Sequence, residues 1–307
     1  MSASSSNNGS RRIDGVAPDA ITASSKSTAG VDYSLGRPLD DARTGGRGGA
    51  LKTVLIYLWA PIANLIWYAL TIVMAIVSLL VWPFDRTGRG QHWCARWWCR
   101  MVAWTIFARI HVSGTEHVRP DRAYVYIANH ASLIDTPALF GYLPYPFRIM
   151  VKKELFYVPF LGWHLQTAGN FGVDRRDPRR AAKSLRRVVD GVRSGTSLVV
   201  FPEGTRTPDG RLQEFKAGAF KIAIRARVPV VPVAIRGTFA LLPKTTLAPR
   251  PGRVDVIIGA PIETDAYGDK DVEALVTRTK QVIQAELDAA VPREPAVGDA
   301  PRRAPLG

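Results

Sequence analysis

Two ionisable side chains, His130 and Asp135, lie five positions apart in the run 129–135 (NHASLID), directly after the apolar run 123–128 (AYVYIA). A short apolar run rich in β-branched and aromatic residues predicts a buried strand. His130 then lies at the carboxyl end of that strand, where open α/β sheets present their ligand sites. Residues five apart are not neighbours on a helix surface, so the chain must turn between them. Such a turn can aim the Asp135 carboxylate at one imidazole nitrogen and leave the other free to accept a proton.

Two interpretations of this heptapeptide stay open. In the first, His130 is a general base that removes the proton of a substrate hydroxyl, which then attacks an acyl donor without any serine or cysteine nucleophile. In the second, Ser132 begins a helix, Asp135 completes a capping box and His130 is a structural histidine at a strand end. The motifs further along the chain favour the first interpretation.

A second polar cluster follows the apolar run 197–201, at residues 202–206 (PEGTR). Gly204 allows close approach of the backbone to a ligand, and Arg206 offers a planar fork that matches phosphate. Glu203 can orient that arginine or accept a substrate hydroxyl, and Thr205 lies between them. Lys216 lies at the start of the next predicted helix, where charge and helix dipole favour an anion. The alternative is a surface loop with an internal ion pair.

Two further cations follow predicted strands. Arg175 comes after the strand predicted at 170–173 and is a candidate phosphate ligand. Lys152 ends the strand predicted at 148–151 and opens the aromatic segment 151–163, which predicts a loop and short helix beside an apolar channel or, equally, core packing. His164 has no partner in sequence and is predicted to be structural.

The elements that must position these side chains form an α/β pattern over residues 111–291. We predict a mixed, mostly buried central sheet flanked by helices, and we expect the prolines of 228–235 to place that strand at an edge or to make it irregular. The predicted strands span 123–128, 148–151, 170–173, 197–201, 229–235 and 253–258, and the predicted helices 133–142, 178–193, 216–226 and 270–290.

An apolar amino-terminal segment precedes this domain. Residues 54–82 hold no charged side chain, and a helix of that length would reach about 43 Å, more than the hydrocarbon core of a bilayer. A second helix is predicted at 91–110, where tryptophan and arginine alternate as in interfacial helices. Residues 51–110 are therefore predicted to form a membrane-embedded helical hairpin. The alternative is one spanning helix followed by a soluble core helix.

Composition limits the function classes. The chain of 307 residues carries a net charge of +15, which favours an anionic partner such as a membrane surface or a phosphorylated substrate. The sequence holds no zinc-finger spacing, RNA-binding signature or clear recognition helix, so we expect no nucleic-acid partner. Cys94 and Cys99 fit neither a redox motif nor a zinc knuckle. Residues 1–50 and 292–307 are predicted to be disordered tails, and the apolar block begins too late for a cleaved signal peptide.

Four blocks in this order, namely 129–135 (NHASLID), 172–175 (GVDR), 201–206 (FPEGTR) and 228–233 (VPVVPV), resemble the 1-acyl-sn-glycerol-3-phosphate acyltransferase (PlsC-like) family of glycerolipid acyltransferases. The resemblance covers about residues 51–262. It implies a membrane-bound enzyme that moves a fatty acyl group from acyl-CoA or acyl carrier protein to a lysophospholipid hydroxyl, without a metal or a bound cofactor.

The resemblance also implies roles for single residues. His130 would be the general base, Asp135 its partner, and the acceptor would lie among Arg175, Glu203, Gly204, Thr205 and Arg206; Lys152 and Lys216 match recurrent lysines of the family. The catalytic domain would face the cytoplasm from the cell membrane. The acceptor could also be glycerol 3-phosphate, another lysophospholipid or a glycolipid, or the chain could be a non-catalytic lipid-binding protein. Acyl-chain length, oligomeric state and the groups that stabilise an oxyanion stay open, with backbone N–H groups near Asn129–Asp135 or Lys152 as candidates.

Overall fold

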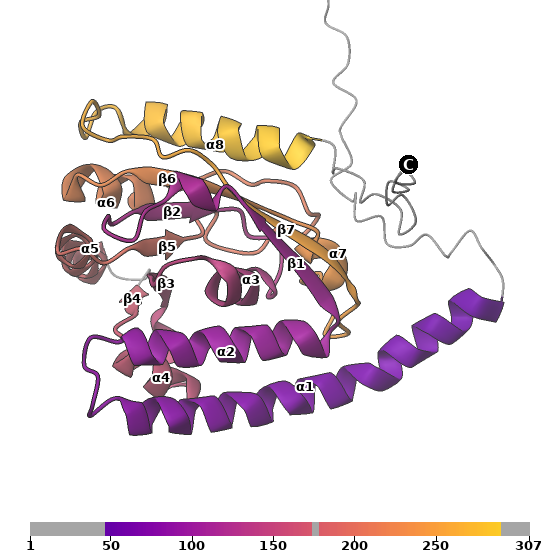
Figure 1. Ribbon diagram of the computed structural model, residues 1–307. Helices are drawn as coiled ribbons and strands as arrows, with labels where there is room; N and C mark the ends of the chain where they lie inside the picture. The colour runs from indigo at the N-terminus through magenta and orange to yellow at the C-terminus, as the bar shows by residue number, and fades with distance from the viewer. Residues whose placement is uncertain (1–46, 174–177, 290–307) are drawn as a thin grey trace, which may run out of the picture. The chain divides into compact units, whose positions relative to one another are not determined.

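The computed structural model describes residues 47–173 and 178–289, and within them the chain forms one seven-stranded sheet with the order β1-β7-β6-β2-β5-β3-β4 (Figure 1). The strands are β1 (Ala108–Ser113), β2 (Val125–Ala128), β3 (Arg148–Lys152), β4 (Phe171–Val173), β5 (Leu198–Val200), β6 (Val230–Arg236) and β7 (Gly252–Ile258). The α-helices are α1 (Arg47–Val81), α2 (Arg89–Thr105), α3 (Asp135–Tyr142), α4 (Leu161–Thr167), α5 (Pro178–Arg193), α6 (Gly218–Ala226), α7 (Thr238–Leu241) and α8 (Val272–Asp288). Two 3₁₀ turns, η1 (Thr115–His117) and η2 (Lys153–Tyr157), complete the set.

The sheet is mixed, as predicted. Neighbouring strands pair in parallel except β6 and β7, so β1 and β7 run opposite to the other five. The carboxyl ends of β2, β5 and β3 therefore meet at the same edge of the sheet, and the segments that follow them can build one site there. All four residues of β2 are buried, which explains why its sequence is apolar without alternation.

Helices cover both faces of the sheet, and each face has its own apolar core. On one face α2 and α3 contribute Cys99 and Leu139, which pack with Tyr126 of β2. On the other face α5, α6 and α8 contribute Val188, Phe220 and Leu275. Figure 1 shows α8 and α6 on one side of the strands and α3 and α2 on the other.

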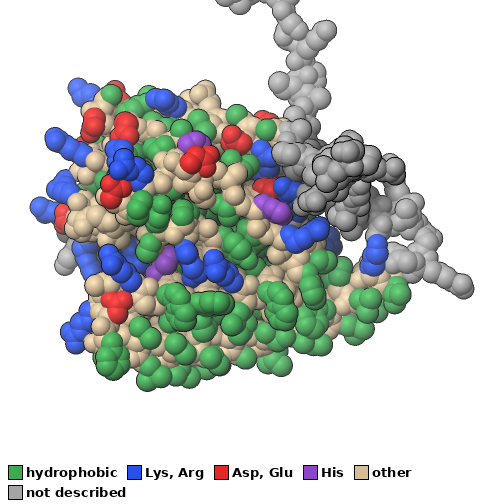
Figure 2. Space-filling model, viewed as in Figure 1, with side chains coloured by type: hydrophobic (Ala, Val, Ile, Leu, Met, Phe, Trp, Pro, Cys, Tyr) green, Lys and Arg blue, Asp and Glu red, His purple; other side chains and the backbone are tan. Residues whose placement is uncertain are grey.

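The two predicted amino-terminal helices are present and pack against each other in antiparallel fashion. Indole N–H groups join them: Trp59 Nε1 donates to the Thr105 carbonyl at 3.0 Å, and Trp98 Nε1 donates to Thr71 Oγ1 at 3.1 Å. In the described part of the chain, α1 is the one helix long and apolar enough to cross a membrane, over Ala50–Val81. Its outer side leaves large apolar side chains exposed, among them Leu58, Leu65 and Tyr68, and Figure 2 shows a continuous band of apolar side chains along α1.

The predicted end of the second helix at residue 110 was wrong. α2 ends at Thr105, Phe107 adopts a positive φ of 53°, and the chain then enters β1. Ala108, Ile110 and Val112 are less exposed than the residues between them, the period of two that a strand requires. Residues 108–110 therefore belong with the sheet rather than with the apolar helices.

The predicted edge position of 228–235 was also wrong, because β6 lies inside the sheet between β2 and β7. Pro232 is tolerated there because it lies just beyond the end of one ladder: the antiparallel pairing with β7 begins at Val233, opposite Ile258. The Pro232 carbonyl still accepts the Gly259 N–H at 2.8 Å. Proline has no backbone N–H to donate to a neighbouring strand. At position 232 no such donor is needed, because β7 ends at Ile258, opposite Val233.

Candidate active site

The structure brings His130 and Asp135 together at the carboxyl end of β2. His130 Nδ1 lies 2.8 Å from Asp135 Oδ2, which makes Nδ1 the donor to an ionised carboxylate. The Asp135 side chain is fully buried, whereas 19% of the His130 side chain is exposed. The imidazole stacks on Phe201 with ring centroids 4.1 Å apart and an interplanar angle of 17°. The ring is thereby held with one nitrogen on the carboxylate and Nε2 available to a substrate.

The turn between the two residues is held by the carboxylate itself. Asp135 Oδ2 also accepts the backbone N–H groups of Ala131, at 2.7 Å, and Ser132, at 2.8 Å. Ser132 Oγ accepts the Ile134 N–H at 3.1 Å and donates to the Leu242 carbonyl at 2.8 Å. The Ser132 N–H bond to Asp135 resembles one arm of a capping box. Ser132 does not begin the helix, however, because the N-cap of α3 is Ile134 and makes no side-chain cap hydrogen bond. α3 itself begins at Asp135, two residues later than predicted.

Two buried side chains fix the backbone beside His130. The Asn129 side chain bridges to β6, donating to the Ile235 carbonyl at 2.9 Å and accepting the Ile235 N–H at 2.7 Å. Glu203 accepts the His130 N–H at 2.6 Å and the Gln213 N–H at 3.2 Å. Burial raises the pKa of Glu203, although both backbone donors oppose the shift. Glu203 therefore braces the turn of residues 130–135 and does not pair with Arg206.

The 202–206 turn places Gly204, Thr205 and Arg206 at the same edge of the sheet. Gly204 adopts a φ of +74°, a backbone conformation that favours glycine, and its N–H donates to the Phe201 carbonyl at 3.1 Å. The turn is joined to the His130 turn by the Thr207 N–H, which donates to the His130 carbonyl at 2.9 Å. Thr205 is exposed and Arg206 is half-buried.

A cation that sequence reasoning missed lies beside this turn. Lys244 Nζ is 3.3 Å from Thr205 Oγ1 and 3.5 Å from the Arg206 carbonyl oxygen. Lys244 lies outside the four motif blocks, in the loop between α7 and β7. No local pattern in the sequence marks it, because its position depends on how that loop packs against a turn almost forty residues earlier.

Two of the other three predicted cations lie at exposed positions. Lys152 ends β3 and is exposed, and Lys216 is exposed just before α6, where its N–H donates to the Pro202 carbonyl at 3.0 Å. The strand predicted before Arg175 is present as β4, but Arg175 itself lies outside the described residues.

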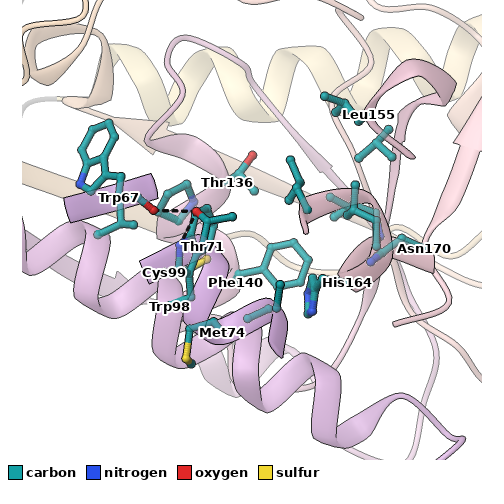
Figure 3. Close-up of a pocket in the computed structure, with 18 of the residues that line it drawn as sticks. Trp67, Thr71, Met74, Trp98, Cys99, Thr136, Phe140, Leu155, His164 and Asn170 are labelled. Carbon is teal, nitrogen blue, oxygen red and sulfur yellow. Dashed lines mark hydrogen bonds between the residues drawn. The ribbon is translucent and has the colours of Figure 1, made fainter. Parts of the chain in front are cut away.

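An apolar cavity of about 350 Å³ adjoins the turn of residues 130–135. Leu133, Ile134 and Thr136, which flank Asp135, form part of its wall. The remaining residues come from α1, α2, α3, β3, η2 and α4, together with Asn170. Figure 3 shows Trp67, Thr71 and Met74 of α1 and Trp98 and Cys99 of α2 around it, with Phe140 of α3 and His164 of α4. The predicted apolar channel beside 151–163 is therefore present, although Leu155 and Leu161 line it rather than the aromatic side chains of that segment.

These contacts bear on two of the sequence hypotheses about neighbouring groups. His164 is structural, as predicted, since its Nδ1 lies 2.9 Å from Ser78 Oγ and joins α4 to α1. The N–H groups of Ala131 and Ser132 are engaged by Asp135 and are not free to stabilise an oxyanion. Among the described residues, no group of three or more His, Cys, Asp and Glu side chains is placed to hold a metal ion.

Comparison with known proteins finds similarity to acyltransferases. A family model described as Acyltransferase matches residues 109–236. A 1-acyl-sn-glycerol-3-phosphate acyltransferase of Pseudomonas aeruginosa is 33% identical over 236 residues, covering 75% of this chain and 88% of the relative. One from Chlamydomonas reinhardtii is 30% identical over 259 residues, covering 83% and 74%.

A solved structure shares the fold. The crystal structure of the 1-acyl-sn-glycerophosphate (LPA) acyltransferase PlsC from Thermotoga maritima superposes with a TM-score of 0.66 at 25% identity. It covers 78% of this chain and 96% of the solved one. The likeness therefore extends beyond the segment matched by the family model.

Proposed function

This chain belongs to the family of 1-acyl-sn-glycerol-3-phosphate acyltransferases, and on that premise we propose that it acylates the free hydroxyl of 1-acylglycerol 3-phosphate to give phosphatidate. The observation that carries the proposal is the 2.8 Å contact between His130 Nδ1 and the buried Asp135. It provides a base at the carboxyl end of β2, beside an apolar cavity and a turn that holds Arg206.

His130 acts as general base through Nε2. It takes the proton of the acceptor hydroxyl, and the oxygen attacks the carbonyl carbon of an acyl thioester. The carbon–sulfur bond then breaks, and the thiolate of CoA or of acyl carrier protein leaves with the proton from His130. Asp135 stabilises the imidazolium and keeps the Nδ1–H tautomer in place throughout.

The apolar cavity is the site for a fatty acyl chain. Its wall is almost wholly hydrocarbon and aromatic, and it begins at Leu133 and Ile134, next to the reacting histidine. A chain bound there would place its thioester carbonyl near His130 while the rest of the chain lies against α1 and α2. Arg206, with Thr205 and Gly204, binds the phosphate of the acceptor, since a guanidinium holds two phosphate oxygens in a fixed fork.

The enzyme works at a membrane surface. α1 is long and apolar enough to enter a bilayer, and exposed Trp93, Trp97 and Trp104 lie along α2, as in helices at the membrane–water boundary. Both helices embed from one side, so that the catalytic domain lies on the cytoplasmic face of the cell membrane, where the acyl donor is dissolved. The basic charge of the chain favours the anionic lipids of that face.

The test is purified protein in detergent, supplied with long-chain acyl-CoA and a panel of acceptors, with release of free thiol as the signal. We expect turnover with 1-acylglycerol 3-phosphate well above that with glycerol 3-phosphate, other lysophospholipids or lysoglycolipids. Turnover confined to another acceptor would replace the substrate. No thiol release with any acceptor, in protein that is folded, would contradict the proposed activity and support a lipid-binding role.

A further inference from the structure

The loop of residues 242–250, between α7 and β7, touches three parts of the molecule that the proposed reaction must bring together. The Leu242 carbonyl accepts the Ser132 hydroxyl at 2.8 Å, within the catalytic turn. Lys244 Nζ lies 3.3 Å from Thr205 Oγ1. The Leu247 carbonyl accepts Asn64 Nδ2 of α1 at 3.0 Å. One short loop therefore links the apolar helix, the turn with Arg206 and the His130 turn.

The charge around Lys244 calls for an anion. Within the part of the chain that the structure describes, neither Lys244 nor Arg206 lies within ion-pair distance of a carboxylate, although the two residues are in contact. The nearest acidic side chains on this segment are engaged elsewhere. Glu203 is buried against backbone N–H groups, and Asp209 accepts Thr207 Oγ1 at 2.8 Å and the Arg211 N–H at 3.1 Å. Lys244 Nζ meets the backbone carbonyl of Arg206, so this turn carries two cationic residues, and neither has a carboxylate partner among the described residues. A bound anion would be attracted by both charges.

A phosphate could reach Lys244 from the acceptor lipid or from the nucleotide of CoA, and the position of the loop favours the lipid. Leu247 is 71% exposed beside Asn64, which lies within the uncharged stretch of α1. Exposed Ile62 and Leu65 continue this apolar surface along the helix. Lys244 is three residues from that surface and in contact with the Arg206 turn, so it lies between the lipid side and the phosphate-binding turn.

We propose that Lys244 is a second binding residue for the phosphate monoester of the acceptor, and that the 242–250 loop receives this lipid from the membrane surface beside Leu247. The inference rests on the proposed acylation of 1-acylglycerol 3-phosphate and names a residue that none of the family blocks contains. The Lys244 ammonium has three donors, two of which face Thr205 Oγ1 and the Arg206 carbonyl. The third binds one phosphate oxygen while Arg206 binds two others.

The test compares Lys244→Gln with a matched control, Lys270→Gln, in the full chain. Lys270 is equally exposed but lies beside Asp269, which pairs with Arg225 at the end of α6, remote from the His130 edge. For Lys244→Gln we expect the KM for 1-acylglycerol 3-phosphate to rise roughly tenfold, the usual consequence of losing a charge-assisted contact, with kcat little changed. The KM for monoacylglycerol, which lacks the phosphate, should stay constant. Lys270→Gln should match the wild type, and Lys244→Arg should recover most of the loss.

Two further arms locate the phosphate. Replacing acyl-CoA by an acyl-pantetheine donor removes the nucleotide phosphates, and the effect of Lys244→Gln on the acceptor KM should persist. Combining Lys244→Gln with Arg206→Ala should cost less than the product of the single effects, because both residues bind the same group.

The opposite outcomes overturn the proposal. An unchanged acceptor KM in Lys244→Gln, or a rise confined to the KM for acyl-CoA, would show that Lys244 does not bind the acceptor phosphate. Both results are measured against a wild type that is active on 1-acylglycerol 3-phosphate. If the proposed function itself were wrong, the wild type would not turn over this acceptor, so the two failures can be told apart.

Discussion

Asp135 receives three donors on a single oxygen, Oδ2, while its other oxygen, Oδ1, is buried without a hydrogen-bond partner among the described residues. The same atom thus holds the turn and orients His130. This double use explains why a fully buried carboxylate is tolerated, because each donor stabilises its charge. It also means that substitution of Asp135 acts on the chemistry and on the shape of the turn together.

His130→Ala should lower kcat for acyl transfer at least a hundredfold, the usual contribution of a positioned general base, while the protein stays folded and membrane-bound. Asp135→Asn should lower kcat by a similar factor, because the amide carries no charge to stabilise the imidazolium. Thiol release with 1-acylglycerol 3-phosphate measures both. His111→Ala, on an exposed position of β1 at the far edge of the sheet, is the control. Near wild-type turnover in folded His130→Ala would rule out the general base.

His164 gives the protein a predictable response to acid. Its burial beside the apolar cavity, reinforced by the positive charge of Arg148, lowers the pKa from 6.5 to about 4. Between these values the unfolded chain binds a proton that the folded chain does not, so stability is full above pH 6.5 and falls as the pH drops towards 4. His164→Gln should remove this part of the slope, on the order of 2 kcal/mol between pH 7 and 4.5.

Thermal unfolding of the wild type and of His164→Gln at pH 7 and pH 4.5 measures the effect. The unfolding midpoint of the variant should fall less on acidification. His111→Gln, at an exposed site, should behave as the wild type. Equal acid sensitivity of the wild type and His164→Gln would show that His164 does not carry the linkage.

At the scale of elements, α2 holds the far end of the helix that begins at Asp135. The last carbonyls of any helix lack partners within it. Here two arginines of α2 supply donors: Arg100 Nε donates to the Gly141 carbonyl at 2.9 Å, and Arg96 donates to the Leu143 carbonyl. The Arg100 guanidinium also lies 5.6 Å from the centroid of the Tyr142 ring. α3 is therefore fixed at its start by the catalytic turn and at its end by the apolar helix pair.

Arg100→Ala should weaken both stability and catalysis. Loss of a charged donor to a carbonyl costs about 1.5 to 3 kcal/mol of unfolding free energy, and a small displacement of Asp135 should lower kcat roughly tenfold without a matching rise in KM. Arg100→Lys should recover part of kcat. Arg89→Ala, at the exposed first residue of the same helix, is the control. A kcat equal to that of the wild type in Arg100→Ala would leave the contact with a stabilising role alone.

The sequence predicted the helices and strands that a local pattern of residues specifies. It did not predict features that depend on contacts with distant parts of the chain. The apolar runs of β2 and β7 and the amphipathic period of α5 and α8 are local signals, and these elements lie within about two residues of their predicted limits. The first three residues of β1 were assigned to the preceding helix because tryptophans and arginines come before them, although the alternation of the strand was present. The interior position of β6 could not be predicted, since it depends on where β7 ends beside Pro232. The His130–Asp135 contact was predictable from local spacing, whereas Lys244 required the folded loop.

At the scale of the whole molecule, α1 lies along the protein instead of standing apart from it. Asn64 contacts the 242–250 loop, and Ser78 contacts His164 of α4. These two contacts are fourteen positions apart, about 21 Å along a helix. Lipid can therefore surround only the outer side of this part of α1. A helix bound to the catalytic domain over that length is better placed in one leaflet than across the bilayer.

Single cysteines at positions 45 and 86, in a chain with Cys94 and Cys99 replaced by alanine, should report this arrangement. If, as proposed, both ends of the helix pair face the cytoplasm, both positions should be protected from an impermeant thiol reagent in intact cells and should react after lysis. Membrane binding and activity of the cysteine-free parent are the controls. Labelling of position 45 from outside, with position 86 protected, would establish a single spanning helix.

The pairing of β1 with β7 has a consequence for the newly made chain. β1 joins the sheet through β7 at its edge, and about 140 residues separate the end of the first strand from the start of the second. At usual rates of synthesis the ribosome needs roughly seven to thirty seconds to make that interval. During this time α1, α2 and β1 have already been synthesised, but β7, the strand with which β1 pairs, has not. A nascent chain stalled before residue 250 should therefore depend on chaperones or on the lipid surface to keep β1 from pairing with other molecules.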